Sequence, residues 1–202
     1  MVRMRVRAKP RGKYPIYLLP FFWNQHRKYG EALQSALLWA RSPKLFLGVA
    51  TLYGMIDRPS SPIDAPLRSL VTVRVSQIND CPFCVDINSA TLLKRGASLE
   101  KVEALPRWRG SNLFDEREQR VLEYAEAMTR SDERVDDAMI ERLRRHFDDD
   151  GIVELTALIA FQNMSSKFNS ALGVPSQGFC RLPGRQTDGP DNQDGRDGEP
   201  QG

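Results

Sequence analysis

The sequence is poor in cysteine, in histidine and in long apolar runs. Its 202 residues include three cysteines and two histidines. Three cysteines cannot form the dense disulfide framework of a small secreted domain. The longest apolar run, IYLLPFFW, has eight residues and contains a proline, whereas a membrane span needs roughly 18. The glycines are isolated or lie near the C-terminus, so there is no glycine-rich phosphate-binding loop.

The charge and the two ends of the chain limit the domain organisation. A net charge of +3 is too small to indicate a nucleic acid or membrane partner for the whole chain. The first 13 residues carry six basic side chains and no acid, and the sequence from Ser176 onward has almost nothing to bury. We therefore expect a basic arm over 1–20, one helical domain over 21–175 and a disordered tail over 176–202. No apolar export signal follows the basic residues, so we expect a cytoplasmic protein with reduced thiols.

Apolar residues recur at helical spacing almost throughout, which predicts an all-α fold. Asp64 and the Asp115-x-x-Glu118 capping box mark helix starts, and Gly96 and Gly173 mark helix ends. We expect helices over 31–40, 43–56, 66–78, 82–95, 115–129, 136–147 and 151–172, with a short one after Ser98. The helices at 66–78 and 151–172 are apolar on more than one side, which indicates a central core position or a subunit interface. We expect a homo-oligomer held through such apolar helices.

The most informative element is Cys81-Pro82-Phe83-Cys84 at a predicted helix start. If Cys81 is the N-cap, Pro82 takes the first helical position, where its missing N–H costs nothing. Cys84 then lies three residues after the cap, and side chains at these two positions approach each other. Both sulfurs lie at the positive end of the helix dipole, which favours the nucleophilic thiolate. The spacing predicts a redox-active dithiol that cycles through a local disulfide.

Three other interpretations of this CxxC pair stay open. A zinc site needs about four ligands, and the remaining candidates Cys180, His26 and His146 have no paired spacing. A thioredoxin-type motif needs a βαβ setting, and no strand pattern is visible. Two inert buried cysteines are also compatible with the spacing, although the position at a helix start argues against them. We expect no metal and no bound organic cofactor.

The residues around the pair resemble a known family. The stretch RSLVTVRVSQINDCPFCVDINSATLLKRGAS is similar to the core of the carboxymuconolactone decarboxylase-like family, in its alkylhydroperoxidase D-like branch. The later FQNMSSKFNSALGVP also resembles family members, so the resemblance covers residues 58–178. It implies a compact multi-helix domain that is usually trimeric or hexameric and that reduces peroxides through the dithiol.

This resemblance also assigns roles to the two cysteines. Cys84 matches the residue that attacks the peroxide and becomes a sulfenic acid, and Cys81 matches the partner that resolves it into a disulfide. It implies a peroxiredoxin-type oxidoreductase with a hydroperoxide or disulfide substrate and an external thiol reductant.

Two positions depart from the family pattern. The family has a histidine four residues after the second cysteine and a glutamate twelve residues before the first, where this chain has Asn88 and Ser69. Neither side chain carries a proton near neutral pH, although Asn88 can orient a water or a thiolate. Asp86 lies two residues after Cys84 and points away from it, as expected for an acid that stabilises a helix N-terminus. We expect an intact dithiol without the usual proton relay, and therefore slow turnover.

Other features leave alternatives open. Gln162, Ser166 and Asn169 form a polar stripe on an apolar helix, either as a solvated edge or as a polar lining of the dithiol pocket. Cys180 lies in the predicted tail, and we expect an incidental thiol. Two other functions also stay open. One is decarboxylation of a muconolactone-type acid, which has no evident need for a dithiol. The other is a non-enzymatic oligomer that kept the fold after losing the relay.

Overall fold

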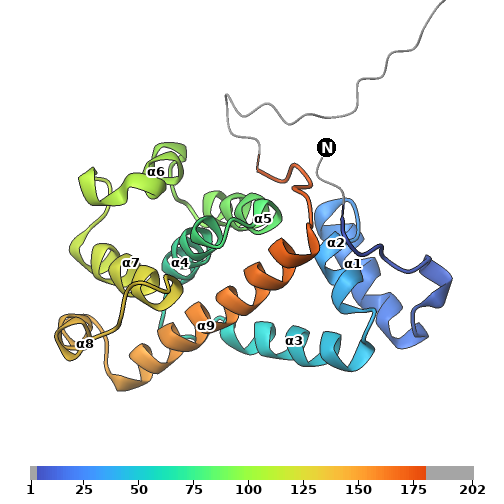
Figure 1. Ribbon diagram of the computed structural model, residues 1–202, viewed down its shortest axis with the longest axis horizontal. Coiled ribbons are helices and arrows are strands. Elements are labelled where there is room, and N and C mark those ends of the chain that lie inside the picture. Colours follow the sequence, from blue (N-terminus) through green and yellow to red (C-terminus); the bar gives the residue numbers. More distant parts are fainter. Residues whose placement is uncertain (1–3, 181–202) are drawn as a thin grey trace, which may run out of the picture.

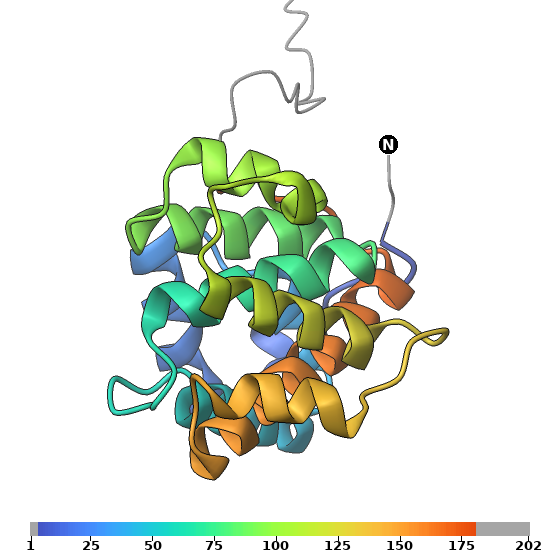
Figure 2. The same cartoon turned by 90° about the vertical axis from the view of Figure 1, so that its left-hand side faces the viewer.

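Helix α4 (Ala65–Ile78) lies at the centre of the protein and is buried on almost all sides. We describe residues 4–180 of a computed structural model, so the predicted tail beyond residue 180 lies outside the described residues. Helix α4 packs against three helices (Figures 1 and 2): α5 (Pro82–Lys94), α7 (Glu116–Thr129) and α9 (Asp149–Leu172). The apolar residues on its several faces are therefore buried by other helices of the same chain. The expectation that this helix forms a subunit interface is not needed to explain its sequence.

The remaining helices lie on two sides of this central group (Figure 1). One side holds α1 (Leu19–Tyr29), α2 (Gln34–Trp39) and α3 (Pro43–Ile56), preceded by the short 3-10 turns η1 (Arg11–Lys13) and η2 (Ile16–Leu18). The other side holds α6 (Leu99–Ala104), the 3-10 helix η3 (Leu105–Gly110) and α8 (Asp137–Arg144). No strand occurs within residues 4–180, which confirms the all-α prediction.

The helix boundaries follow the capping signals. The Leu67 backbone N–H donates to Asp64 Oδ1 at 3.0 Å, and Asp115 and Glu118 form the expected capping box. Gly173 ends α9 in the left-handed conformation with φ 66°, which glycine adopts without a steric penalty. The last helix but one ends at Arg144, three residues earlier than predicted. No helix in the described part of the chain is both long and apolar enough to cross a bilayer.

The beginning of the chain differs from the predicted arm. Helix α1 starts at Leu19, and Pro20 is accommodated in its first turn. The preceding residues lie against the core: the Arg5 N–H donates to the Leu172 carbonyl at 2.9 Å. Tyr14 is buried, and its hydroxyl donates to the Leu37 carbonyl at 3.0 Å. The N-terminal segment is basic in composition, but it packs on the domain through its few apolar residues.

The first residues of the predicted tail are also bound to the domain. Asp86 is buried, and its carboxylate accepts hydrogen bonds from Ser176 Oγ and from the backbone N–H groups of Gln177, Gly178 and Cys180, at 2.7 to 2.9 Å. Asp86 thus holds the chain that follows α9 rather than only stabilising the start of α5. The domain boundary at 175 stays a prediction, but these contacts favour a boundary after residue 180.

Candidate functional site

Cys81 and Cys84 meet at the start of α5 in the predicted arrangement. Cys81 is the N-cap, Pro82 occupies the first turn, and the Cys84 N–H donates to Cys81 Sγ at 3.2 Å. The two residues are joined as a disulfide, with their Cα atoms 5.3 Å apart. Both are almost completely buried, at 1% and 2% exposure. Any reaction at these sulfurs therefore depends on the hollows that border them.

Cys84 borders an aromatic pocket of about 280 Å³ between the α1–α3 group and helices α5 and α9. Seven aromatic side chains line it: Phe21, Tyr29, Trp39, Phe46, Tyr53, Phe83 and Phe161. Lys28 is the one charged residue among the described lining residues. A pocket of this size and character suits an organic molecule with a large apolar part.

A buried amide contacts the sulfur of Cys84. Asn169 Nδ2 donates to Cys84 Sγ at 3.3 Å, and Asn169 Oδ1 accepts from Ser35 Oγ at 2.7 Å. With its oxygen accepting from the Ser35 hydroxyl, the amide turns its NH₂ group toward the sulfur. An N–H donor at this distance stabilises a thiolate more than a thiol. Helix α9 thus supplies a stabilising group for a Cys84 anion.

The buried hydroxyl of Ser76 links α4, α5 and α9 beside the pocket. Ser76 Oγ accepts from Asn88 Nδ2 at 3.1 Å and from Gln162 Nε2 at 2.9 Å, and donates to the Thr72 carbonyl at 2.5 Å. Asn88 and Gln162 also line the aromatic pocket. The position of the family histidine is therefore held by an amide that is fixed by a hydrogen bond and has no titratable neighbour in this cluster.

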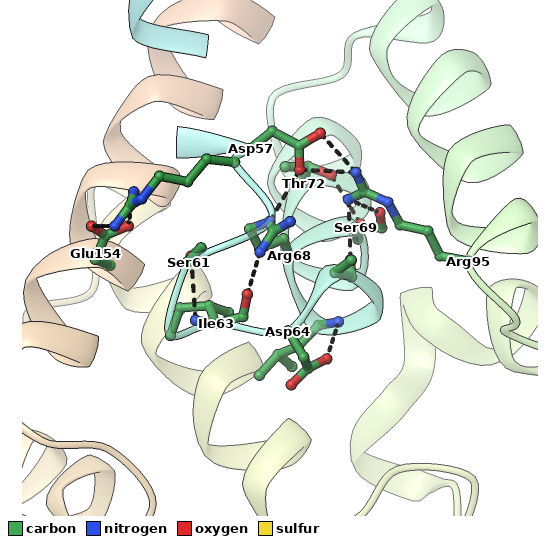
Figure 3. A network of polar contacts seen from close by, with 12 residues as sticks. Asp57, Ser61, Ile63, Asp64, Arg68, Ser69, Thr72, Arg95 and Glu154 are labelled. Atoms are coloured by element: carbon green, nitrogen blue, oxygen red, sulfur yellow. Dashed lines mark hydrogen bonds and ion pairs between the residues drawn. The ribbon is translucent and has the colours of Figure 1, made fainter. Parts of the chain in front are cut away.

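Ser69 takes part in a second polar network, which Figure 3 shows. Ser69 Oγ accepts from an Arg95 NH group at 2.9 Å, and the same guanidinium donates to both carboxylate oxygens of Asp57, at 2.7 and 2.9 Å. Arg68 Nε donates to Asp57 at 3.0 Å. The region where the family has a glutamate therefore has a carboxylate after all, and Asp57 of the α3–α4 connection supplies it.

A small cavity of about 30 Å³ joins the two networks. Ser69, Asn88, Gln162, Asp57 and Tyr53 line it among others, and this volume is sufficient for a water molecule. Tyr53, Asn88 and Gln162 line the aromatic pocket as well, so the two spaces adjoin. Partial burial and the negative charge of Asp57 raise the pKa of Tyr53 to about 12. Its phenol therefore stays protonated and is a hydrogen-bond donor at neutral pH.

The structure brings together most of the residues singled out in the sequence. Cys84, Asn88, Gln162 and Asn169 all line the aromatic pocket. Ser69 lies at the adjoining cavity rather than beside the sulfurs. The third member of the polar stripe, Ser166, donates to the carbonyl of its own helix and accepts from Asn79 instead. The stripe is therefore a pocket lining at two of its three positions.

Several residues of the site were missed by the sequence analysis. Ser35, Ser76 and Arg95 contact predicted residues from other helices, and no motif marks them. Asp57 belongs to the site through its contact with Arg95. Only the tertiary fold reveals these contacts. Within residues 4–180, no cluster of three or more His, Cys, Asp or Glu side chains has an arrangement that could hold a metal ion.

The fold and the paired cysteines define an all-helical protein with a dithiol at a helix start. Residues 43–127 match the model of the carboxymuconolactone decarboxylase family, and the chain belongs to this family. It is 44% identical over 178 residues to the uncharacterized protein YnjA of Escherichia coli (strain K12), covering 88% of this chain and 98% of the relative. It is also 31% identical to the uncharacterized protein YdfG of Bacillus subtilis (strain 168), covering 56% of this chain and 78% of that relative.

Solved structures with the same fold are peroxidase-related proteins and a debrominase. An uncharacterized peroxidase-related protein with an alkylhydroperoxidase AhpD core, from Ralstonia eutropha JMP134, matches with a TM-score of 0.79 and 20% identity over 87% of this chain and 94% of that chain. The debrominase Bmp8 matches with a TM-score of 0.76 and 21% identity over 89% of this chain and 95% of that chain. Their similarity confirms the alkylhydroperoxidase D-like fold.

Proposed function

We propose that this protein is a dithiol oxidoreductase that reduces organic hydroperoxides, with Cys84 as the attacking residue. The observation that carries the proposal is the environment of Cys84, whose sulfur meets both the aromatic pocket and the Asn169 amide. Cys81 does not line this pocket. The assignment of Cys84 as nucleophile thus rests on access to substrate and on stabilisation of its anion.

The proposed reaction has two steps. The Cys84 thiolate attacks the terminal peroxide oxygen, the O–O bond breaks, and the alkoxide takes up a proton and leaves as an alcohol. Cys84 is then a sulfenic acid. The Cys81 sulfur attacks Cys84 Sγ, the S–O bond breaks, and water leaves as the S–S bond forms. The net change is one hydroperoxide reduced to alcohol and water and one dithiol oxidised to a disulfide. An external thiol must then restore the dithiol.

The groups for proton transfer differ from those that the family resemblance implies. Tyr53 is a protonated phenol at the pocket wall, and it is suited to donate a hydrogen bond to the departing alkoxide. Asn88 and Gln162 can orient the substrate but cannot exchange protons at neutral pH. General bases typically contribute about 10²–10⁴ in rate, so slow turnover is expected even with an effective pocket.

The experiment is peroxide consumption with a thiol reductant in the wild type and in Cys84→Ser. The wild type should consume cumene hydroperoxide, a bulky apolar substrate, faster than hydrogen peroxide at equal concentration. Cys84→Ser should abolish this activity, whereas Cys180→Ser, which removes a thiol that does not line the pocket, should retain it. If Cys84→Ser consumes peroxide at the wild-type rate, the redox proposal fails and the non-enzymatic alternative replaces it.

Reductive debromination of an aromatic substrate is a second candidate. The aromatic pocket favours it, since a related fold belongs to the debrominase Bmp8, also solved as a variant in complex with 2,3,4-tribromopyrrole. The electron balance is the same: the carbon–bromine bond is replaced by carbon–hydrogen, bromide leaves, and the dithiol becomes a disulfide. Bromide release from tribromopyrrole, measured beside cumene hydroperoxide reduction, distinguishes the two. Decarboxylation of a muconolactone-type acid gains no support, because it leaves the dithiol without a role.

A further inference from the structure

A second hollow reaches the cysteine pair from the other side. It has a volume of about 450 Å³, and it lies between the end of α4, the first turns of α5, and α6 with η3. Cys81 lines this hollow and Cys84 does not, whereas Cys84 lines the aromatic pocket and Cys81 does not. Each sulfur of the pair therefore has its own hollow, which we call the Cys81 recess and the aromatic pocket.

We propose that the Cys81 recess is the binding site for the thiol reductant, and that it takes neutral or cationic thiols in preference to anionic ones. This proposal rests on the proposed function, since it describes how the disulfide formed in that reaction is reduced again. The reductant and the substrate would then use opposite sides of the same disulfide.

A reductant that enters the recess meets Cys81 rather than Cys84. A reductant thiolate that attacks Cys81 Sγ forms a mixed disulfide there, and the S–S bond breaks with Cys84 as the leaving thiolate. A second reductant thiol then attacks the mixed disulfide and releases Cys81 as the thiolate, so that two reductant thiols are oxidised to one disulfide. Each sulfur receives one N–H, Cys84 Sγ from Asn169 at 3.3 Å and Cys81 Sγ from the Cys84 backbone at 3.2 Å. Both can therefore leave as thiolates, and access through the recess directs the attack to Cys81.

The charges around the recess determine which thiols can approach. Asp80 and Glu103 are the charged residues among those that line it, and both are exposed acids. Ser89, Val85 and Pro106 supply a mixed neutral lining. Anionic thiols are repelled by the two carboxylates, whereas cationic thiols are attracted, and this effect weakens as salt is added.

The first experiment identifies the sulfur that is attacked. The protein is oxidised with diamide, so that the disulfide is prepared without peroxide, and is then mixed briefly with 2-mercaptoethanol and quenched in acid. Free thiols are alkylated and the CPFC peptide is sequenced by tandem mass spectrometry. We expect the mixed disulfide on Cys81 and the alkyl group on Cys84. The reverse distribution overturns the proposal and leaves the peroxidase function untouched, because that function is tested separately by peroxide consumption.

The second experiment tests the charge selection of the recess. Oxidised wild type, Glu103→Gln and Glu103→Lys are reduced by cysteamine, 2-mercaptoethanol and 3-mercaptopropionate, which have similar length and different charge. Comparing each thiol between variants cancels the intrinsic reactivity of that thiol. Glu103→Lys should speed reduction by 3-mercaptopropionate by about two- to fivefold at low salt and slow reduction by cysteamine to a similar extent, with Glu103→Gln between. Glu100→Gln, an exposed acid on the same helix outside the recess, should change neither rate. Equal rates in all four proteins contradict the proposal.

Discussion

At the residue scale, the reactivity of Cys84 depends on the groups that surround its sulfur. Its attachment at the start of α5 brings it to Cys81, and this local arrangement follows from the CPFC spacing alone. Its other contact, from Asn169, joins residues 85 positions apart, and the Ser35 contact that orients Asn169 spans 134 positions. Such contacts depend on how helices pack, so the sequence pattern predicted the dithiol and offered a pocket lining as one of two interpretations of Asn169, but it did not predict the contact of Asn169 with the sulfur.

Removing the Asn169 amide should slow the first chemical step. A hydrogen bond to a charged group is worth about 1.5–3 kcal/mol, so Asn169→Ala should lower the rate of Cys84 oxidation by cumene hydroperoxide about ten- to hundredfold. Ser35→Ala should have a smaller effect in the same direction, because it only frees the amide to rotate. Stopped-flow oxidation of the reduced protein measures this step. Ser165→Ala is the control, because Ser165 lines the same pocket, and a loss there as large as in Asn169→Ala contradicts a specific role for the amide.

Restoring the family relay should raise activity near neutral pH. Asn88 borders both the aromatic pocket and the small cavity, and Ser69 lines that cavity beside Arg95. Asn88→His with Ser69→Glu therefore places two ionisable side chains at the small cavity, with the new carboxylate next to the Arg95 guanidinium. We expect the double variant to reduce cumene hydroperoxide about tenfold faster or more at pH 7. The activity of the wild type should keep rising with pH as the thiol ionises, whereas the activity of the variant should level off at a lower pH. An unchanged rate in a folded double variant contradicts the view that a missing relay limits turnover.

At the element scale, capping residues made the helix boundaries predictable. Asp64, Cys81, Asp115 and Gly173 all act as the sequence indicates, because capping depends on neighbours within a few residues. Helix α1 was missed because its first turn contains a proline and it follows a basic stretch. It is stabilised largely through packing with distant residues, such as the edge-to-face contact of Phe21 and Phe46 at 4.7 Å. Local patterns therefore predict elements whose signals are local, and fail where tertiary packing decides.

The segment after α9 should contribute measurably to stability. Asp86 accepts four hydrogen bonds from residues 176–180. Removing this segment takes away all four donors to its carboxylate. At about 1–3 kcal/mol for an unsatisfied group, truncation after residue 175 should lower the thermal midpoint by about 5 °C or more. Truncation after Cys180 keeps these contacts and is the matched control. If both truncations leave the midpoint unchanged, the segment is dispensable, as its composition suggests.

The buried carboxylate of Glu126 on α7 should make stability depend on acidity. Burial opposes its ionisation, but hydrogen bonds from Trp108 and Arg109, with the charge of Arg74, prevail and lower the pKa of Glu126. A lowered pKa in the folded state stabilises the protein above the unfolded value of about 4.3, and this contribution is lost as the pH falls through the folded value.

Glu126→Gln tests this dependence directly. It should cost about 3–5 kcal/mol at pH 7, because Arg74 is left buried without its charge partner, and the difference from wild type should shrink toward pH 3. Urea unfolding at both pH values measures it. A difference that stays constant with pH contradicts the assignment. Glu133→Gln, which removes an acid from a half-exposed pair with Arg130, is the control and should have little effect.

At the scale of the whole molecule, a helix that the sequence pattern did not single out exposes several large apolar side chains. The apolar side chains of α4 are buried within one chain, whereas α3 leaves Leu45, Leu52 and Met55 exposed at 59%, 45% and 61%. A helix that is apolar on its outer side indicates a partner surface. We propose that α3 contributes to contact with further copies of this chain. This keeps the prediction of a homo-oligomer and replaces α4 by α3, while α9 still exposes Val153 and Met164.

Light scattering tests this proposal. The wild type at micromolar concentration should have a mass that is a multiple of the chain mass of 22.9 kDa, and Leu45→Glu with Met55→Glu should shift it toward the monomer. Val135→Glu, at an exposed apolar residue near α8, is the control and should leave the mass unchanged. A monomeric wild type contradicts the prediction of an oligomer, and an oligomer insensitive to the α3 variant contradicts this helix as the interface.

The proposed reaction requires that organic hydroperoxide oxidises Cys84 and that Cys81 resolves the product. Its most direct test is a single turnover of the fully reduced protein with one equivalent of cumene hydroperoxide and no reductant, followed by alkylation and mass spectrometry. We predict one alcohol formed per chain and a disulfide between Cys81 and Cys84. Cys81→Ser should instead accumulate a sulfenic acid on Cys84 that a dimedone probe captures. Peroxide loss without this disulfide, or dimedone labelling of Cys81 rather than Cys84 in the corresponding single variants, would contradict the account.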